Sequence, residues 1–365
     1  MADARAPCWV RGAPGVFALL LLAGAARGQE PAPAAPADRS ALRLRIVAAG
    51  DTMLGSDLRR GERGVPPRDG EGVLAHVRPL FQAADLAFLN LEGPLADGLP
   101  QKKCRPDSRS CYPFRMPTRL TRALTAAGID VVSNANNHAG DLGPEGLEST
   151  IRALDAAGVA HAGRLGDEAR LEVNGLRVAL LAAHTGHCCL SVLDLEALTS
   201  AVRRAAGEAD LVILSMHAGA EGAAARRIPE GMERAYGEDR GEVKKAARAA
   251  VEAGADLVLG HGPHVLRGME VWQGRLIAYS LGNFVGYRQF GLGGGPTGTS
   301  VVLEVTLDGE GKLVAARLHP VALDREGVPH PDRKARRGLR DVRELSRLDF
   351  PATGVRVARD GTLSW

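Results

Sequence analysis

Residues able to bind a metal or transfer a proton stand directly after several apolar runs of this sequence. The clearest run, residues 256–260, is followed by two histidines, His261 and His264. Four other runs end similarly, in Asp51, in Asn90 and Glu92, in Asn136, Asn137 and His138, and in His217. Imidazole and carboxylate together suit Zn, Mn, Fe or Ni better than Ca or Mg. We therefore expect these residues to converge on one metal site.

Some of these residues also have an ordinary structural use. Asp51 follows Gly50, where we expect the chain to turn, and its carboxylate could equally cap the next segment. The Asn136–His138 group could form a turn closed by an asparagine side chain, and His217 alone would usually be a bonded residue at a sheet edge. His261 and His264 differ, because Gly262-Pro263 should hold the two imidazoles close together.

The elements that position these residues recur in a fixed order along the chain. A helical stretch ends in small residues, an aspartate follows, and an apolar strand begins; the aspartates are Asp85, Asp130, Asp210 and Asp256. We predict helices over residues 118–127, 146–157, 195–206 and 241–253, and further strands over 177–183 and 276–281. This alternation predicts an α/β fold with parallel strands, whose ligands bind beyond the carboxyl ends of the strands.

The C-terminal part of the chain has a different pattern. Residues 301–307 and 313–319 are predicted to pair antiparallel around Asp308-Gly309, a dipeptide typical of hairpins. The basic stretch 325–347 is predicted to be a solvated loop and a surface helix, and 355–357 with 363–365 a closing hairpin.

The N-terminal residues have the three-part pattern of a secretory signal peptide, which we assign to residues 1–28. Arg5 and Arg11 precede the apolar run 16–23, and Ala26-Arg27-Gly28 offers small residues for cleavage. The alternative, an uncut anchor, would need an apolar run of roughly 20 residues. Residues 29–41 are predicted to be an Ala/Pro-rich linker. We expect an exported protein, periplasmic or extracellular, that is soluble after cleavage.

Charge and cysteine content restrict the partners and the compartment. The chain has 365 residues and a formal net charge of +3, part of which belongs to the leader. A nearly neutral protein gives no support for nucleic-acid binding. Cys104 and Cys111 bracket a short polar loop and are candidates for a disulfide, as expected in an oxidising compartment. Cys188 and Cys189 could pair with each other, pair with the first two, or stay reduced.

Six motifs occur in an order that resembles the CapA family of poly-γ-glutamate capsule synthesis proteins, which are related to calcineurin-like metallophosphoesterases. The resemblance covers residues 42–323, and its motifs are Gly50–Leu54, Asn90–Pro94, Ser133–His138, His217–Glu221, Gly260–His264 and Tyr279–Phe284. It implies a four-layer α/β/β/α sandwich of metallophosphatase type with a metal site at the strand ends. We assign residues 324–365, the basic segment and closing hairpin, to the same domain.

The resemblance also implies roles for individual residues. His138 would contact the scissile phosphate and aid the leaving group, and one or two divalent ions (Mn, Zn or Fe) would be bound by Asp51, Glu92, Asn137, His217, His261 and His264. Asn90, Asn136, Glu221 and Asn283 are further site candidates. Two departures bear on activity: Met53 stands where related phosphoesterases carry a histidine, and Asn90-Leu91-Glu92 replaces an expected aspartate. A thioether is a poor ligand for these ions.

Two functions follow from this pattern. The first is a metal-dependent hydrolase acting on a phosphoester or on amide bonds of an anionic surface polymer. The second is a non-catalytic factor that binds such a polymer and works with a membrane complex for its synthesis and export. In the second, the basic residues Lys102, Lys103, Arg105 and Arg109 could hold the polyanion, unless they form only a solvated loop. A third function would be that of a scaffold that keeps the sheets of the fold and binds an unrelated partner.

Overall fold

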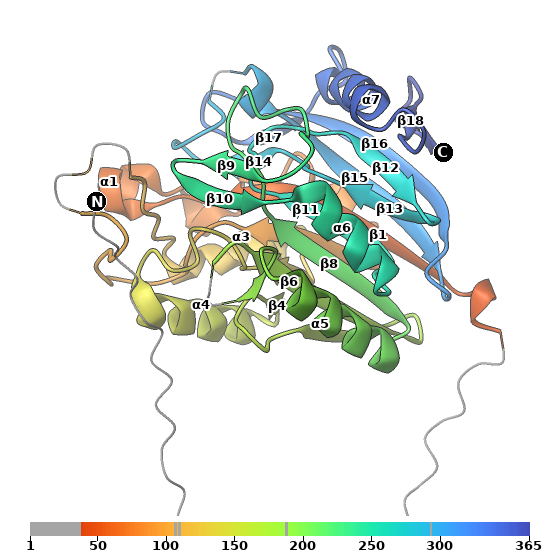
Figure 1. Ribbon diagram of the computed structural model, residues 1–365. Coiled ribbons are helices and arrows are strands. Elements are labelled where there is room, and N and C mark those ends of the chain that lie inside the picture. Colours follow the sequence, from red (N-terminus) through yellow and green to blue (C-terminus); the bar gives the residue numbers. More distant parts are fainter. Residues whose placement is uncertain (1–37, 106–107, 109–110, 187–188, 293) are drawn as a thin grey trace, which may run out of the picture. The chain divides into compact units, whose positions relative to one another are not determined.

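Two mixed β-sheets face each other in the computed structural model, which describes residues 38–365 except 106–107, 109–110, 187–188 and 293 (Figure 1). The predicted signal peptide lies outside the described residues, as does most of the predicted linker. Within the described part of the chain, no helix combines the length and the apolar character needed to cross a membrane.

The first sheet contains the N-terminal strands and the long C-terminal hairpin. Its order is β17 (Pro329–Pro331), β16 (Leu313–Leu323), β15 (Thr299–Asp308), β1 (Arg43–Met53), β2 (Leu86–Leu91), β3 (Val131–Ser133) and β4 (Ala160–Ala162). Strands β1 to β4 are parallel, and β14 (Asn283–Gly286) pairs with the end of β1. The predicted antiparallel pairing across Asp308-Gly309 is confirmed by β15 and β16.

The second sheet has a parallel centre with antiparallel strands at its edges. Its order is β12 (Met269–Trp272), β13 (Arg275–Ala278), β11 (Leu257–His261), β8 (Leu211–His217), β6 (Leu176–His184) and β5 (Ala169–Val173), and β7 (Leu190–Ser191) also pairs with β6. The strand predicted over 276–281 is shorter than expected, because β13 ends at Ala278 and Leu281 forms only an isolated bridge with Leu266.

Helices cover the outer face of each sheet. The first sheet packs against α2 (Arg78–Gln82), α3 (Thr121–Ala127) and α4 (Gly143–Ala157), and the second against α5 (Leu195–Glu208) and α6 (Val243–Glu252). Figure 1 shows α5 and α6 side by side over β8. A third apolar cluster lies between the sheets. The predicted four-layer α/β/β/α sandwich is therefore confirmed.

The C-terminal segment closes one end of the inter-sheet core. Helix α7 (Arg337–Asp349) buries Leu339 and Val342 in the cluster between the sheets while its other face stays exposed. The predicted closing hairpin forms between β18 (Arg356–Val357) and β19 (Leu363–Ser364).

The recurrent aspartates have one structural role, at the start of four parallel strands. The Asp256 amide donates to the Val212 carbonyl at 2.8 Å, and the Asp256 carboxylate accepts the Val212 N–H at 2.8 Å. The same reciprocal pair joins Asp85 to Arg45, Asp130 to Ala87, and Asp210 to Arg177. Each aspartate thus fixes the register of its strand against a neighbouring strand, which positions the opposite, carboxyl ends of the strands.

Candidate metal centre

Strand register brings the predicted site residues together at the carboxyl ends of both sheets. In the first sheet, Asp51 of β1 pairs with Asn90 of β2 and with Asn283 of β14. In the second sheet, His261 of β11 pairs with His217 of β8. These neighbours are far apart in sequence, so their proximity is a result of the parallel topology.

Gly50 has a different role from the one we expected. The chain does not turn there, because β1 continues to Met53. The pairing of β1 with β2 shifts register between Ala49 and Asp51, so the strand is irregular at Gly50. A Cβ atom at Gly50 would lie 1.9 Å from the Gly282 carbonyl oxygen, so the close approach of the backbone requires glycine.

Two buried carboxylates, of Asp51 and Glu92, and the half-buried imidazole of His264 form the centre of the site. The Asp51 Oδ2 lies 3.0 Å from the Nδ1 of His264, and the Nε2 of His264 lies 3.4 Å from the Oε1 of Glu92. One ligand atom from each lies within 4.8 Å of the others, as one metal ion requires. His217 and His261 approach from the second sheet, with Nδ1 atoms 3.9 and 3.7 Å from the Asp51 Oδ1.

Several buried polar atoms at this centre have no hydrogen-bond partner among the described residues. They include both carboxylate oxygens of Glu92, both ring nitrogens of His261, the Nε2 of His217 and the Oδ1 of Asn137. Buried polar groups are normally paired, because an unpaired group loses its hydration without compensation. Carboxylate, imidazole and amide atoms left unpaired around one point fit a divalent transition metal.

Burial and mutual charge shift the pKa values of these groups. Burial raises the pKa of Glu92 to about 8 and lowers that of His261 to about 4. Burial also lowers the pKa of His217, so both imidazoles are neutral near pH 7, the form that binds metal. Burial opposes the charged forms of His264 and Asp51. The charge of Glu92 and the contact with Asp51 nevertheless raise the pKa of His264 to about 9, and the contact with His264 holds the pKa of Asp51 well below its usual range.

His138 lies beside this centre and is held by a partner that the sequence reasoning missed. Its Nδ1 is 2.7 Å from the Oδ2 of Asp141, and its Nε2 is 3.8 Å from the Oε1 of Glu92. The ring stacks on Phe114 at 4.2 Å between centroids. Burial lowers the pKa of His138 to about 4, although the charge of Asp141 opposes that shift. The three-residue spacing between His138 and Asp141 was the available sequence clue.

Lys103 points into the site. Its Nζ lies 2.9 Å from the Oδ1 of Asp141, 3.2 Å from the Nδ1 of His138 and 2.9 Å from the carbonyl oxygen of Asn137. Lys102, by contrast, forms an exposed ion pair with Glu145 at 2.7 Å. Arg105 is exposed, and Arg109 lies outside the described residues. Among the described basic residues of this loop, Lys103 faces the site while Lys102 and Arg105 are exposed, and the binding of a polyanion by the loop stays a prediction.

The further candidates support the centre in different ways. The Nδ2 of Asn90 donates to Asp51 at 2.9 Å, and the Oδ1 of Asn283 lies 3.0 Å from the Nδ1 of His264. Asn136 bonds to the Leu91 carbonyl and accepts the N–H of His138, so it fixes the turn. Glu221 pairs with the buried Arg240 and lies 3.9 Å from the Nε2 of His264.

Met53 packs away from the metal centre. Its side chain is fully buried in the cluster between the first sheet and its helices, and its sulfur accepts the N–H of Gly55 at 3.2 Å. Met53 is therefore part of the apolar core and does not face the metal centre.

The cysteines divide into a bridged pair and a pair that the structure describes in part. A disulfide joins Cys104 to Cys111, with Cα atoms 5.7 Å apart. Cys188 lies outside the described residues, so the pairing of Cys188 and Cys189 stays a prediction.

A cavity of about 470 Å³ opens onto the centre. Its lining includes Glu92, His138 and His264 of the site, together with four aromatic residues and three arginines: Tyr112, Phe114, Tyr236, Phe290, Arg59, Arg60 and Arg288. A bound molecule would therefore contact both the metal ligands and His138.

Comparison with known proteins identifies the family. The family model "Bacterial capsule synthesis protein PGA_cap" matches residues 45–288, more than half of the chain. The PGA biosynthesis protein CapA of Bacillus subtilis (strain 168) is 29% identical, and the alignment covers 65% of this chain and 61% of that protein. The capsule biosynthesis protein CapA of Bacillus anthracis is 28% identical, and the alignment covers 91% of this chain and 80% of that protein. The crystal structure of a 5'-nucleotidase precursor from Thermus thermophilus has a TM-score of 0.42 and 15% identity, and covers 83% of this chain and 59% of that one. The chain belongs to the bacterial capsule synthesis protein family PGA_cap.

Proposed function

We propose that this protein is an exported, metal-dependent hydrolase that cuts a phosphoester or amide bond in an anionic surface polymer of the poly-γ-glutamate type. The observation that carries the proposal is the set of unpaired buried ligand atoms around Asp51, Glu92 and His264, which opens into the same cavity as His138. Buried ligand atoms without hydrogen-bond partners lower the free energy of unfolding unless a bound ion compensates them.

Asp51, Glu92 and His264 would hold the first metal ion, with His217, His261 and Asn137 completing the ligand set. A divalent transition metal held by these residues would polarise the bond to be cut and lower the pKa of a water molecule to roughly 7. Since the Nδ1 of His138 is engaged by Asp141, the Nε2 is the atom through which His138 can exchange a proton with a substrate.

Arginines extend the positive charge from the metal centre along the surface. A second cavity of about 490 Å³ shares Arg60 and Arg288 with the first and adds Arg63 and Arg325. Only Arg288 forms an ion pair among these four in the described part of the chain, with Glu326. Two joined basic cavities fit an extended polyanion better than a small substrate.

Export is the untested part of this proposal and rests on the sequence of residues 1–28. An exported protein of a capsule synthesis family would work beside a membrane complex that makes or exports the polymer. Fractionation of cells that express the full chain, with removal of residues 1–28 as the control, would test it. Retention of the full chain in the cytoplasm would contradict export.

A non-catalytic role in polymer assembly is the alternative, and Met53 favours it because this position supplies no ligand to the metal centre. Metal analysis of the purified protein, combined with turnover of a phosphodiester and of poly-γ-glutamate before and after chelation, separates the two functions. We expect stoichiometric metal and chelator-sensitive turnover that is lost in Asn137→Ala and His138→Ala but kept in the exposed control Glu145→Gln. Bound metal without turnover supports the assembly role, and a metal-free, inactive protein rules out the hydrolase.

A further inference from the structure

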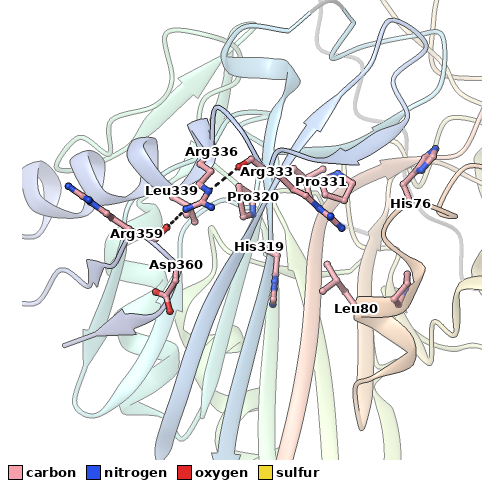
Figure 2. Close-up of a pocket in the computed structure, with 12 residues that line it drawn as sticks. His76, Leu80, His319, Pro320, Pro331, Arg333, Arg336, Leu339, Arg359 and Asp360 are labelled. Carbon is pink, nitrogen blue, oxygen red and sulfur yellow. Dashed lines mark hydrogen bonds between the residues drawn. The ribbon is translucent and has the colours of Figure 1, made fainter.

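A separate cavity of about 470 Å³ lies between the edge of the first sheet and the C-terminal segment (Figure 2). It shares no lining residue with the metal-centre cavity. Of its lining residues, only His76, Pro79 and Leu80 fall within residues 45–288, the part matched by the family. Residues that follow the family match, from β16 and from the C-terminal segment, therefore build most of the cavity.

The floor of this cavity is apolar. It is formed by Leu80 of α2, Pro320 and Val321 of β16, Pro331 of β17 and Leu339 of α7. Ligand cavities of proteins are commonly about 300–1,000 Å³, mainly apolar, with a few polar groups that fix orientation. The size and lining of this cavity match that description.

Three arginines line the cavity, Arg333, Arg336 and Arg359. Arg336 is held in place by neutral acceptors, because its Nε donates to the Arg333 carbonyl at 3.1 Å and its Nη1 to the Arg359 carbonyl at 3.0 Å. Its backbone has φ of 49°, which is uncommon outside glycine, so the conformation that aims this side chain is stabilised by its contacts. Carbonyl partners leave the charge of the guanidinium uncompensated.

The second arginine, Arg333, extends toward the side of the cavity that carries Leu80 and His76 (Figure 2). Its guanidinium forms no ion pair with any carboxylate in the described residues. The carboxylate that lines the cavity, Asp360, is engaged by Arg317 at 3.2 Å. The cavity therefore combines an apolar floor with two cationic groups that have no anionic partner among the described residues.

We propose that this cavity binds an organic anion. The apolar body of the ligand would lie on Leu80, Val321 and Leu339, and its carboxylate or phosphate would face Arg333 and Arg336. Guanidinium groups pair with both kinds of anion through two parallel hydrogen bonds. The proposal is independent of the hydrolase, because the two cavities have no lining residue in common.

Calorimetric titration of the full protein at low salt tests the proposal with four probes: phenyl phosphate, benzoate, inorganic phosphate and phenol. We expect phenyl phosphate or benzoate to bind more tightly than inorganic phosphate and phenol. Only phenyl phosphate and benzoate carry both an apolar ring and an anionic group. Arg333→Gln should weaken that binding by at least about tenfold, since a charge-assisted pair is lost. The matched control is Arg340→Gln, an exposed arginine of α7 that lies outside the cavity.

The outcomes separate the site from the metal centre. Preference for phenyl phosphate assigns a phosphate ligand, and preference for benzoate assigns a carboxylate ligand. Equal affinity in Arg333→Gln and the unchanged protein would overturn the proposal, as would binding of inorganic phosphate as tight as that of phenyl phosphate. Turnover at the metal centre should be the same in both variants, so failure of this proposal would leave the hydrolase standing.

Discussion

The Nδ1 atom of His138 lies 2.7 Å from the Oδ2 atom of Asp141, and this contact orients the imidazole toward the metal centre. Asp141 is fully buried and also accepts the N–H of Phe114 at 2.7 Å, so the carboxylate cannot move away from the ring. Since Phe114 stacks on His138, one carboxylate holds both the ring and the surface that supports it.

Asp141→Asn should reduce turnover by about 10²–10⁴-fold, the range over which proton transfer contributes to catalysis. The asparagine keeps an oxygen for the Phe114 N–H but no longer selects the same protonated form of His138. Metal content should stay stoichiometric, which distinguishes loss of orientation from loss of the site. Metal analysis and steady-state kinetics of the same sample provide the check; full activity in the variant would refute the role of Asp141.

Binding of Mn²⁺ or Zn²⁺ to chelator-treated protein should raise the free energy of unfolding. At a metal concentration of about 100 times Kd, the expected gain is about 2.7 kcal/mol. Glu92→Gln should abolish most of that gain, because the amide replaces a carboxylate whose two oxygens have no hydrogen-bond partner among the described residues. Thermal unfolding with and without metal measures the effect. The exposed variant Glu172→Gln should respond to metal like the unchanged protein.

Removal of the Cys104–Cys111 disulfide should affect stability and turnover together. Replacement of both cysteines by serine should cost about 2 kcal/mol, because the bridge closes a short loop in the unfolded chain. Turnover should fall as well, since Lys103, next to Cys104, contacts Asp141, His138 and Asn137. Lys102→Ala, which breaks only an exposed pair, should keep its turnover. Unchanged kinetics in the double serine variant would show that Lys103 is positioned without the bridge.

The pH dependence of stability should change in Asp256→Asn. Burial raises the pKa of Asp256 from 3.8 to about 6, against the opposing effects of the Val212 N–H and the charge of Arg275. The folded chain therefore binds the proton more tightly than the unfolded chain. The contribution of Asp256 to the free energy of unfolding is therefore fully present below pH 3.8, and it is lost as the pH rises through about 6.

The asparagine in Asp256→Asn keeps an oxygen for the Val212 N–H and cannot ionise. The variant should therefore not lose free energy of unfolding as the pH rises. We expect the variant and the unchanged protein to have equal stability near pH 4, and the variant to be more stable above pH 6 by on the order of 2 kcal/mol. Urea unfolding across this pH range measures the difference. Parallel stability curves for the two proteins would contradict the assignment.

The helix and strand pattern of the sequence predicted an α/β fold and the edge at which the site lies, and the four-layer arrangement followed from the resemblance to the CapA family. Apolar strands that end in Asp51, Asn90, His217 and His261 can place those residues only at the carboxyl end of a parallel sheet. The aspartates before the strands were visible as a pattern, but their use as register clamps became clear only from the paired hydrogen bonds, as with Asp256 and Val212.

Tertiary structure alone decided which side chains meet. Lys103 and Asp141 are 38 positions apart and lie in loops, whose course local sequence does not predict. Gly50 was expected to turn the chain, whereas the approach of Gly282 from a distant segment is what requires glycine. Met53 lies with Val47 and Ala49 in the apolar cluster between the first sheet and its helices, and that cluster forms only when the helices pack on the sheet. Each outcome depends on contacts between remote segments, which form only when the sheets pack.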